Sequence, residues 1–154
     1  MKKILVSRCL YLNDMAGYEG QNRQMQDPRF QKWKEEGRLF PACPEALGGP
    51  EIIGVDAERS GDKVLGRDGS DLTAEYQKGA EKLVKKAEKE QVLCAILRET
   101  SPFCASHEIY DGSFSQQLVP GKGMAAEQLE AHGIRVFSEH QLDEVEQLIS
   151  QEEL

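Results

Sequence analysis

Short apolar runs recur along the chain, each followed by a polar or glycine-containing segment. The runs at residues 3–7 and 91–97 predict two strands, and the second run is almost wholly apolar. Such a composition is typical of a parallel strand that is covered on both faces. Residues 38–40 and 134–137 predict two further short strands, the first of them ended by Pro41.

Between these runs the apolar positions take a helical spacing. Asp27 and Pro28 predict the start of a helix, because an N-cap residue precedes proline at the first helical position, and Gly37 marks its end. A second helix is expected from Thr73, where apolar residues recur on one helical face. These residues are Tyr76, Ala80, Leu83, Val84 and Ala87.

The last third of the chain repeats the alternation. We expect a helix over residues 121–132 with Gly133 as its C-terminal signal, and a final helix after a capping box at residues 138–141. Glycine-rich residues 48–70 predict an excursion with a short hairpin around Val64 and Leu65. Strands that alternate with helices imply parallel βαβ units. We therefore expect one α/β domain over residues 1–154: a Rossmann-like three-layer sandwich with a mainly parallel sheet of about four to five strands.

The charge narrows the choice of partners. The formal net charge is −8, which argues against extended nucleic-acid binding, because a phosphate backbone needs a positive surface. The apolar runs are too short to span a bilayer. Residues 1–6 are similar to the start of a signal peptide, but Ser7, Arg8 and Cys9 interrupt the apolar run. We expect a cytoplasmic protein with no membrane contact.

Three of the four cysteines share a position relative to the predicted strands. Cys9, Cys43 and Cys104 each lie just past the carboxyl end of a predicted parallel strand. Ligands bind at that edge of open α/β sheets, so the three thiols are expected to converge. Cys94 lies inside a strand run, where a free cysteine behaves as a small buried hydrophobe.

Converging thiolates are soft ligands that suit zinc or an iron–sulfur cluster. A structural zinc site has four ligands, and His107 is available as the fourth. A [4Fe–4S] cluster normally takes four cysteines, so three would leave one iron open to a sulfur-bearing substrate. Both alternatives stay open at this point.

Polar side chains next to the cysteines offer acid–base chemistry. Glu45 follows Cys43 by two residues, and a carboxylate with a raised pKa can act as a general base. Ser101 precedes Cys104 by three residues, and its hydroxyl could position water, donate a hydrogen bond or attack. Each has a structural alternative: Glu45 as a solvated loop acid, and Ser101 as a turn residue before Pro102.

The aromatic residues and the other histidines carry weaker signals. Tyr18, Phe103 and Tyr110 are candidates to stack on a planar substrate, although each could equally serve packing. His132 and His140 lie at a predicted helix end and in a capping turn, where structural roles are expected.

These motifs resemble those of the thiouracil desulfidase-like family, long catalogued as a domain of unknown function. The matching segments follow family order over nearly the whole chain: V-S-R-C-L at 6–10, Y-E-G at 18–20, P-A-C-P-E-A-L-G-G at 41–49, R-D-G-S-D-L-T at 67–73, S-P-F-C at 101–104, I-Y-D-G-S-F at 109–114, L-V-P-G-K-G at 118–123 and H-G-I-R-V-F-S-E at 132–139. Each segment is short, and their combination is specific.

The resemblance implies a [4Fe–4S] cluster on Cys9, Cys43 and Cys104, with one iron not ligated by protein. It implies that this iron binds the sulfur of a small thiolated nucleobase or nucleoside, and that water replaces the sulfur, which leaves as hydrosulfide. Glu45 and Ser101 would be the acid–base pair. The sequence departs from the family pattern at residues 50–55, where a proline- and arginine-rich run is common, at Arg8 and at Ala105.

Two other hypotheses compete with a desulfidase. The first is a non-enzymatic zinc- or cluster-binding module that senses or carries sulfide. The second is a metal-free enzyme with Cys104 as nucleophile and His107 as base.

Overall fold

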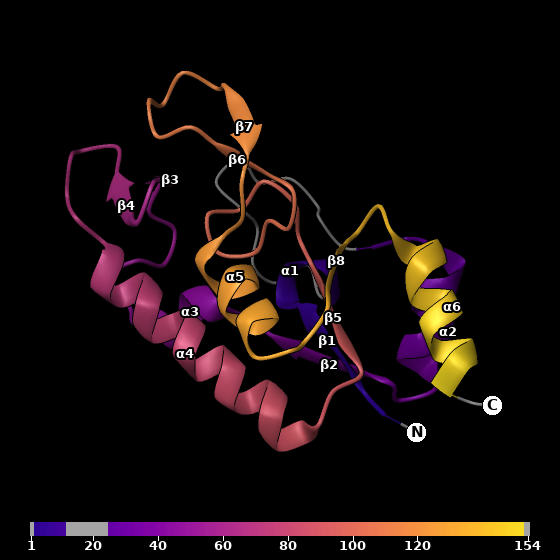
Figure 1. Cartoon of the computed structure of the whole chain (residues 1–154). Helices are drawn as coiled ribbons and strands as arrows, with labels where there is room; N and C mark the ends of the chain where they lie inside the picture. The colour runs from indigo at the N-terminus through magenta and orange to yellow at the C-terminus, as the bar shows by residue number, and fades with distance from the viewer. Residues whose placement is uncertain (1, 12–24, 153–154) are drawn as a thin grey trace.

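The computed structural model describes residues 2–11 and 25–152 (Figure 1). A parallel sheet lies at its centre, with the strand order β2-β1-β5-β8. The strands are β1 (Ile4–Ser7), β2 (Leu39–Ala42), β5 (Cys94–Leu97) and β8 (Val136–Ser138). The predicted α/β class with a mainly parallel sheet is confirmed.

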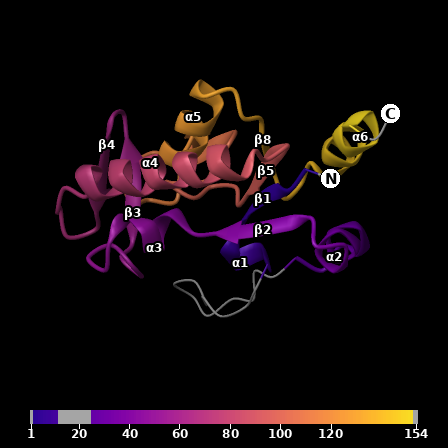
Figure 2. The same ribbon diagram turned by 90° about the horizontal axis from the view of Figure 1, so that it is seen from below.

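Helices cover both faces of this sheet (Figures 1 and 2). One core lies under α4 (Thr73–Glu90) and α5 (Met124–Ala131), and the other under α2 (Pro28–Glu35) and α6 (Leu142–Glu152). The strands supply both cores by alternation, since Leu5 faces the α4 side and Ile4 and Val6 face the α2 side. Within the described ranges, no helix is long and apolar enough to cross a membrane.

Two short helices follow the first two strands of the sheet. Helix α1 (Arg8–Tyr11) begins directly after β1, and α3 (Pro44–Gly48) begins two residues after β2. Sequence analysis placed Cys9 and Cys43 just past strand ends and predicted no helix at either position, so both helices were missed. At four and five residues they are too short to show a helical apolar period.

Several predicted boundaries need correction. Strand β2 continues through Pro41 to Ala42, because among the described strands β2 lies at the sheet edge next to β1, and a missing N–H is tolerated there. Strand β5 starts at Cys94 rather than at residue 91, because Gln91 closes α4 in a left-handed conformation, with φ 50° and ψ 51°. Strand β8 is Val136–Ser138 rather than 134–137.

The predicted helices are present, with shifts at their ends. Asp27 caps α2, accepting the Arg29 N–H at 2.8 Å, as expected for an N-cap residue. The predicted apolar face of α4 is buried. Helix α5 begins at Met124, later than predicted, because Gly123 is still extended. At the start of α6 half of the predicted capping box forms: Gln141 Oε1 accepts the Ser138 N–H at 2.9 Å.

Two antiparallel hairpins project beside the sheet. The expected hairpin consists of β3 (Ala57–Ser60) and β4 (Lys63–Gly66). A second hairpin, β6 (Glu108–Tyr110) with β7 (Leu118–Pro120), was not predicted, since its outer strand is exposed throughout and lacks alternation. Tyr18 and its Y-E-G motif lie outside the described residues.

Candidate functional site

The three cysteines predicted to converge do so at the carboxyl edge of the sheet. Cys9 lies in α1 after β1, Cys43 is the N-cap residue of α3 after β2, and Cys104 lies in the loop after β5. Their charges interact in all three pairs: Cys9 raises the pKa of Cys43 and of Cys104, and Cys43 raises that of Cys104. Thiols that are 95 positions apart in sequence (104 − 9) therefore share one site.

Burial dominates the electrostatics of these thiols. Cys104 is 6% exposed, and burial raises its pKa to about 12, with the neighbouring Cys9 acting in the same direction. A hydrogen bond from Ser7 and the charge of Arg98 oppose this rise. Burial also raises the pKa of Cys43, while the N–H groups of Ala46 and Glu45 favour its thiolate without closing a full capping hydrogen bond. Burial thus outweighs the favourable polar contacts of Cys43 and Cys104 and raises the pKa of both thiols.

Glu45 lies in the first turn of α3, two residues after Cys43, and is half-buried. Its Oε1 accepts the Gly54 N–H at 2.8 Å, which ties the segment after the double glycine to the site. Burial raises the pKa of Glu45, and the Gly54 hydrogen bond and the Arg98 charge oppose that rise. A carboxylate with a raised pKa beside the thiols is suited to accept a proton.

Ser101 occupies the turn that leads into Cys104 and is 7% exposed. Its Oγ accepts the N–H groups of Phe103 at 3.1 Å and of Cys104 at 3.2 Å. Ser101 therefore has the structural role that the sequence offered as an alternative, that of a turn residue before Pro102. Both bonds use the oxygen as acceptor, so the hydroxyl proton can still be donated into the site.

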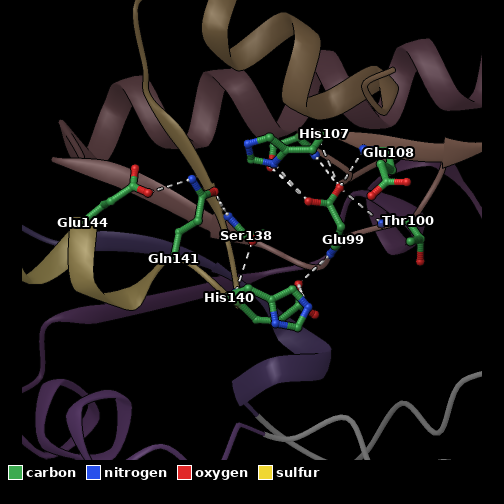
Figure 3. Close-up of polar contacts among 10 residues, drawn as sticks. Glu99, Thr100, His107, Glu108, Ser138, His140, Gln141 and Glu144 are labelled. Atoms are coloured by element: carbon green, nitrogen blue, oxygen red, sulfur yellow. Dashed lines mark hydrogen bonds and ion pairs between the residues drawn. The ribbon is translucent and has the colours of Figure 1, made fainter. Parts of the chain in front are cut away.

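Glu99 anchors the loop that carries Cys104 (Figure 3). Its Oε1 accepts the N–H groups of Ser106 and His107 at 3.1 Å and of Glu108 at 3.2 Å. Burial opposes the charged form, but these hydrogen bonds outweigh it and lower the pKa of Glu99. The loop is therefore closed on a half-buried carboxylate that sequence analysis did not single out.

His107 contacts the Glu99 carboxylate through both its backbone N–H and its ring. Its Nδ1 lies 3.1 Å from Glu99 Oε2 and 2.9 Å from Ser106 Oγ, and its side chain is 56% exposed. These contacts support neither a fourth zinc ligand nor a base paired with Cys104, which is buried. The exposed His132 and His140 lie at a helix end and in the turn before α6, as expected.

Phe103, a candidate for stacking on substrate, packs in the core instead. Its ring stacks on Tyr76 of α4, with centroids 3.9 Å apart and planes 8° from parallel, and it is 3% exposed. Tyr110 lies half-buried in β6. Cys94 is fully buried in the α2–α6 core, as predicted, and burial raises its pKa to about 12.

Sequence analysis missed three further residues around the thiols: Ser7, Gly54 and Arg98. Ser7 ends β1 and is 2% exposed, and its Oγ accepts the Arg98 N–H at 3.0 Å. A serine at the end of a predicted strand, two residues before Cys9, could have indicated a polar contact at the site. The positions of Gly54 and Arg98 depend on tertiary structure, because they approach Glu45 from separate segments.

The sequence predicts two alternative metal sites, a single zinc ion or an iron–sulfur cluster. Within residues 2–11 and 25–152, no three His, Cys, Asp or Glu side chains are arranged to hold a single metal ion. A cluster takes its thiolates on separate iron atoms, so its ligands surround a volume rather than meet at one point. Three mutually interacting thiols, with Cys104 buried and Cys9 and Cys43 half-buried, fit such a cluster by donor chemistry and by charge.

The fold and the site define a class: an open parallel α/β protein with three cysteines and a carboxylate at the carboxyl edge of its sheet. Comparison with known proteins gives the family. A family model for 2-thiouracil desulfurase matches residues 4–141. The chain belongs to this family.

A similar protein is the "Uncharacterized protein YbbK" of Bacillus subtilis strain 168, with 35% identity over 152 residues, which covers 92% of this chain and 99% of that one. A similar solved structure is the [4Fe–4S]-dependent thiouracil desulfidase TudS. Its TM-score is 0.92 at 37% identity, and the match covers 98% of this chain and 99% of that chain.

Proposed function

We propose that this protein is an iron–sulfur-dependent desulfidase that replaces the sulfur of a thiolated pyrimidine with oxygen and releases hydrosulfide. Cys9, Cys43 and Cys104 would hold a [4Fe–4S] cluster with one iron not ligated by protein. The observation that carries the proposal is the pairwise interaction of these three thiols next to Glu45. Membership of the 2-thiouracil desulfurase family and the likeness to TudS support it.

When bound, the cluster would supply a Lewis-acidic iron that polarises the carbon–sulfur bond of the substrate. Glu45 would take a proton from water, whose oxygen adds to the thiocarbonyl carbon. The carbon–sulfur bond then breaks, the sulfur leaves as hydrosulfide, and the new carbon–oxygen bond remains. The protons of the water would pass to the sulfur and to Glu45. Carbon and sulfur each keep their oxidation state, so the reaction needs no external oxidant or reductant.

The neighbours of Glu45 would hold it in place for this step. The Gly54 N–H fixes one carboxylate oxygen, and Arg98 brings a positive charge to the same region. Ser101, held in the turn before Cys104, would donate its hydroxyl proton to the leaving sulfur or to the substrate. Both roles are proposals that follow from position and chemistry.

The substrate would be a small nucleobase or nucleoside, since the net charge of −8 disfavours a polyanion. We propose one catalytic domain over residues 1–154 and a cytoplasmic location, where reducing conditions keep thiols unpaired.

The test is release of sulfide and formation of uracil from 2-thiouracil by the anaerobically reconstituted protein. Glu45→Gln should lower kcat by about 10²- to 10⁴-fold with unchanged iron content, because a general base contributes in that range. Glu51→Gln is the matched control: it changes an exposed carboxylate six positions away and should keep wild-type activity.

Ser101→Ala should also lower kcat, and its iron content must be measured, because the turn holds Cys104. Full activity in both Glu45→Gln and Ser101→Ala would refute the catalytic assignment. Wild-type protein with a bound cluster and no turnover would instead favour the sulfide-binding module.

A further inference from the structure

Ser7 lies where the three cysteine-bearing segments meet. It is the last residue of β1, the strand between β2 and β5. In the register, Ser7 pairs with Ala42, the residue before Cys43, and Val6 pairs with Ile96. Cys9 follows two residues later. The chain thus places the buried hydroxyl of Ser7 next to the segments that carry the three cysteines.

The hydroxyl of Ser7 has a defined donor on one side. The Arg98 N–H donates to Ser7 Oγ at 3.0 Å, across the gap between β1 and β5. Ser7 is 2% exposed, so water does not compete freely for its remaining hydrogen-bonding capacity. The hydroxyl proton must therefore find an acceptor within the protein.

That acceptor is the sulfur of Cys104, which Ser7 meets as a hydrogen-bond partner. The contacts form a relay from the Arg98 N–H through the Ser7 hydroxyl to the Cys104 sulfur. The Cys104 N–H is separately held by Ser101. Backbone and side chain of the same ligand are thus each fixed by one serine.

We propose that Ser7 is a positioning residue: anchored by the Arg98 N–H, its hydroxyl donates to the Cys104 thiolate, orients that ligand and tunes the bound cluster. The inference rests on the proposed function, because it needs Cys104 to be a cluster ligand. Partners of metal ligands orient them and set their basicity. A donor to a cluster sulfur also makes the reduction potential more positive.

Ser7 would act on the reaction through the Cys104 ligand, because its hydroxyl is a hydrogen-bond partner of that residue. A hydrogen bond withdraws charge from the thiolate and leaves the iron a stronger Lewis acid. The desulfidation itself involves no redox change, so the reduction potential serves as a readout that is independent of turnover.

The experiment compares reconstituted wild type, Ser7→Ala and Ser7→Thr under anaerobic conditions. We expect the cluster potential of Ser7→Ala to shift to more negative values, and its iron to be lost to a chelator about 10-fold faster. Ser7→Thr keeps a hydroxyl and should stay near the wild-type potential. Ser138→Ala is the matched control, because Ser138 is also 2% exposed and ends β8, a strand of the same sheet that does not pair with β1.

A potential for Ser7→Ala equal to that of wild type, or a shift shared by Ser138→Ala, would overturn the proposal. If Ser7→Ala does not fold, the test uses the iron–thiolate vibrations of the wild-type cluster. These vibrations should shift on exchange into deuterium oxide. Ser7→Thr should show the same shift. No shift would overturn it. A wild-type protein without a cluster would overturn both this inference and the proposed function, whereas an unchanged potential in a loaded variant overturns this inference alone.

Discussion

Two carboxylates of the candidate site, Glu45 and Glu99, have pKa values that are shifted in opposite directions. Glu45 is held by one N–H group, and burial keeps its pKa raised, as a proton acceptor requires. Glu99 accepts several N–H groups from one loop, and its pKa is lowered. Burial thus favours the protonated form of Glu45, and hydrogen bonds favour the charged form of Glu99.

The charge of Glu99 should make folding stability depend on pH. Its folded pKa lies below the value of 4.5 for a free glutamate, so its contribution is present above that value and is lost as pH falls through the folded pKa. Glu99→Gln should lower the free energy of unfolding at pH 7, and the difference from wild type should shrink in acid. Urea unfolding of both proteins between about pH 3 and pH 7 measures this.

Glu108→Gln is the control, since Glu108 is exposed and meets Glu99 through its backbone N–H. A difference between wild type and Glu99→Gln that stays constant down to the acid limit would contradict the anchoring role of the charge.

At the scale of elements, the position of α3 depends on a close contact with α4. A Cβ atom on Gly79 of α4 would lie 2.3 Å from the Pro44 carbonyl oxygen and 3.2 Å from the Gly48 Cα. Gly79 therefore lets α4 approach the backbone that follows Cys43 and carries Glu45. A backbone contact this close cannot be relieved by a change of rotamer.

Gly79→Ala tests this packing. Alanine in place of glycine normally stabilises a helix by about 1 kcal/mol, but here we expect a lower Tm and less iron per chain, because α3 must move. Gln77→Ala, at an exposed position of the same helix, should leave both values near wild type. A Tm for Gly79→Ala at or above that of wild type would show that α3 is not held by this contact.

The helices and strands differ in how well the sequence predicted them. Strand β5 could be predicted because its residues are apolar and all buried, and α4 because its buried residues recur at helical spacing over 18 residues. Their order along the chain was enough to bring Cys9, Cys43 and Cys104 to one edge. Helices α1 and α3 and the β6–β7 hairpin were missed, because they are short and are shaped by tertiary contacts.

The residues of the site that depend on tertiary contacts were missed as well. Glu45 and Ser101 are adjacent in sequence to cysteines, so motifs indicated them. The roles of Ser7 and Glu99 come from hydrogen bonds to residues at a distance along the chain, such as the bond from Arg98 to Ser7, 91 positions apart. Such distant partners leave no pattern in the local sequence. The role of His107 could not be predicted for the same reason, because it depends on the contact with Glu99.

For the molecule as a whole, a cluster on the three cysteines would cross-link segments that follow β1, β2 and β5. Ligands that bind only the folded state stabilise it by mass action. Chelation of the iron should therefore lower the Tm. Amide hydrogen exchange should increase around α1, α3 and residues 101–107, while the α2–α6 core changes little. A uniform increase across the molecule, or none at the site, would contradict this picture.

The central claim is the cluster on three cysteines, and its most direct test is iron and sulfide per chain after anaerobic purification. We predict about four iron and four sulfide in the wild type, the same content in Cys94→Ser, and loss of most iron in Cys9→Ser, Cys43→Ser and Cys104→Ser. A wild type that cannot be reconstituted, or equal iron content in all four variants, would contradict the account.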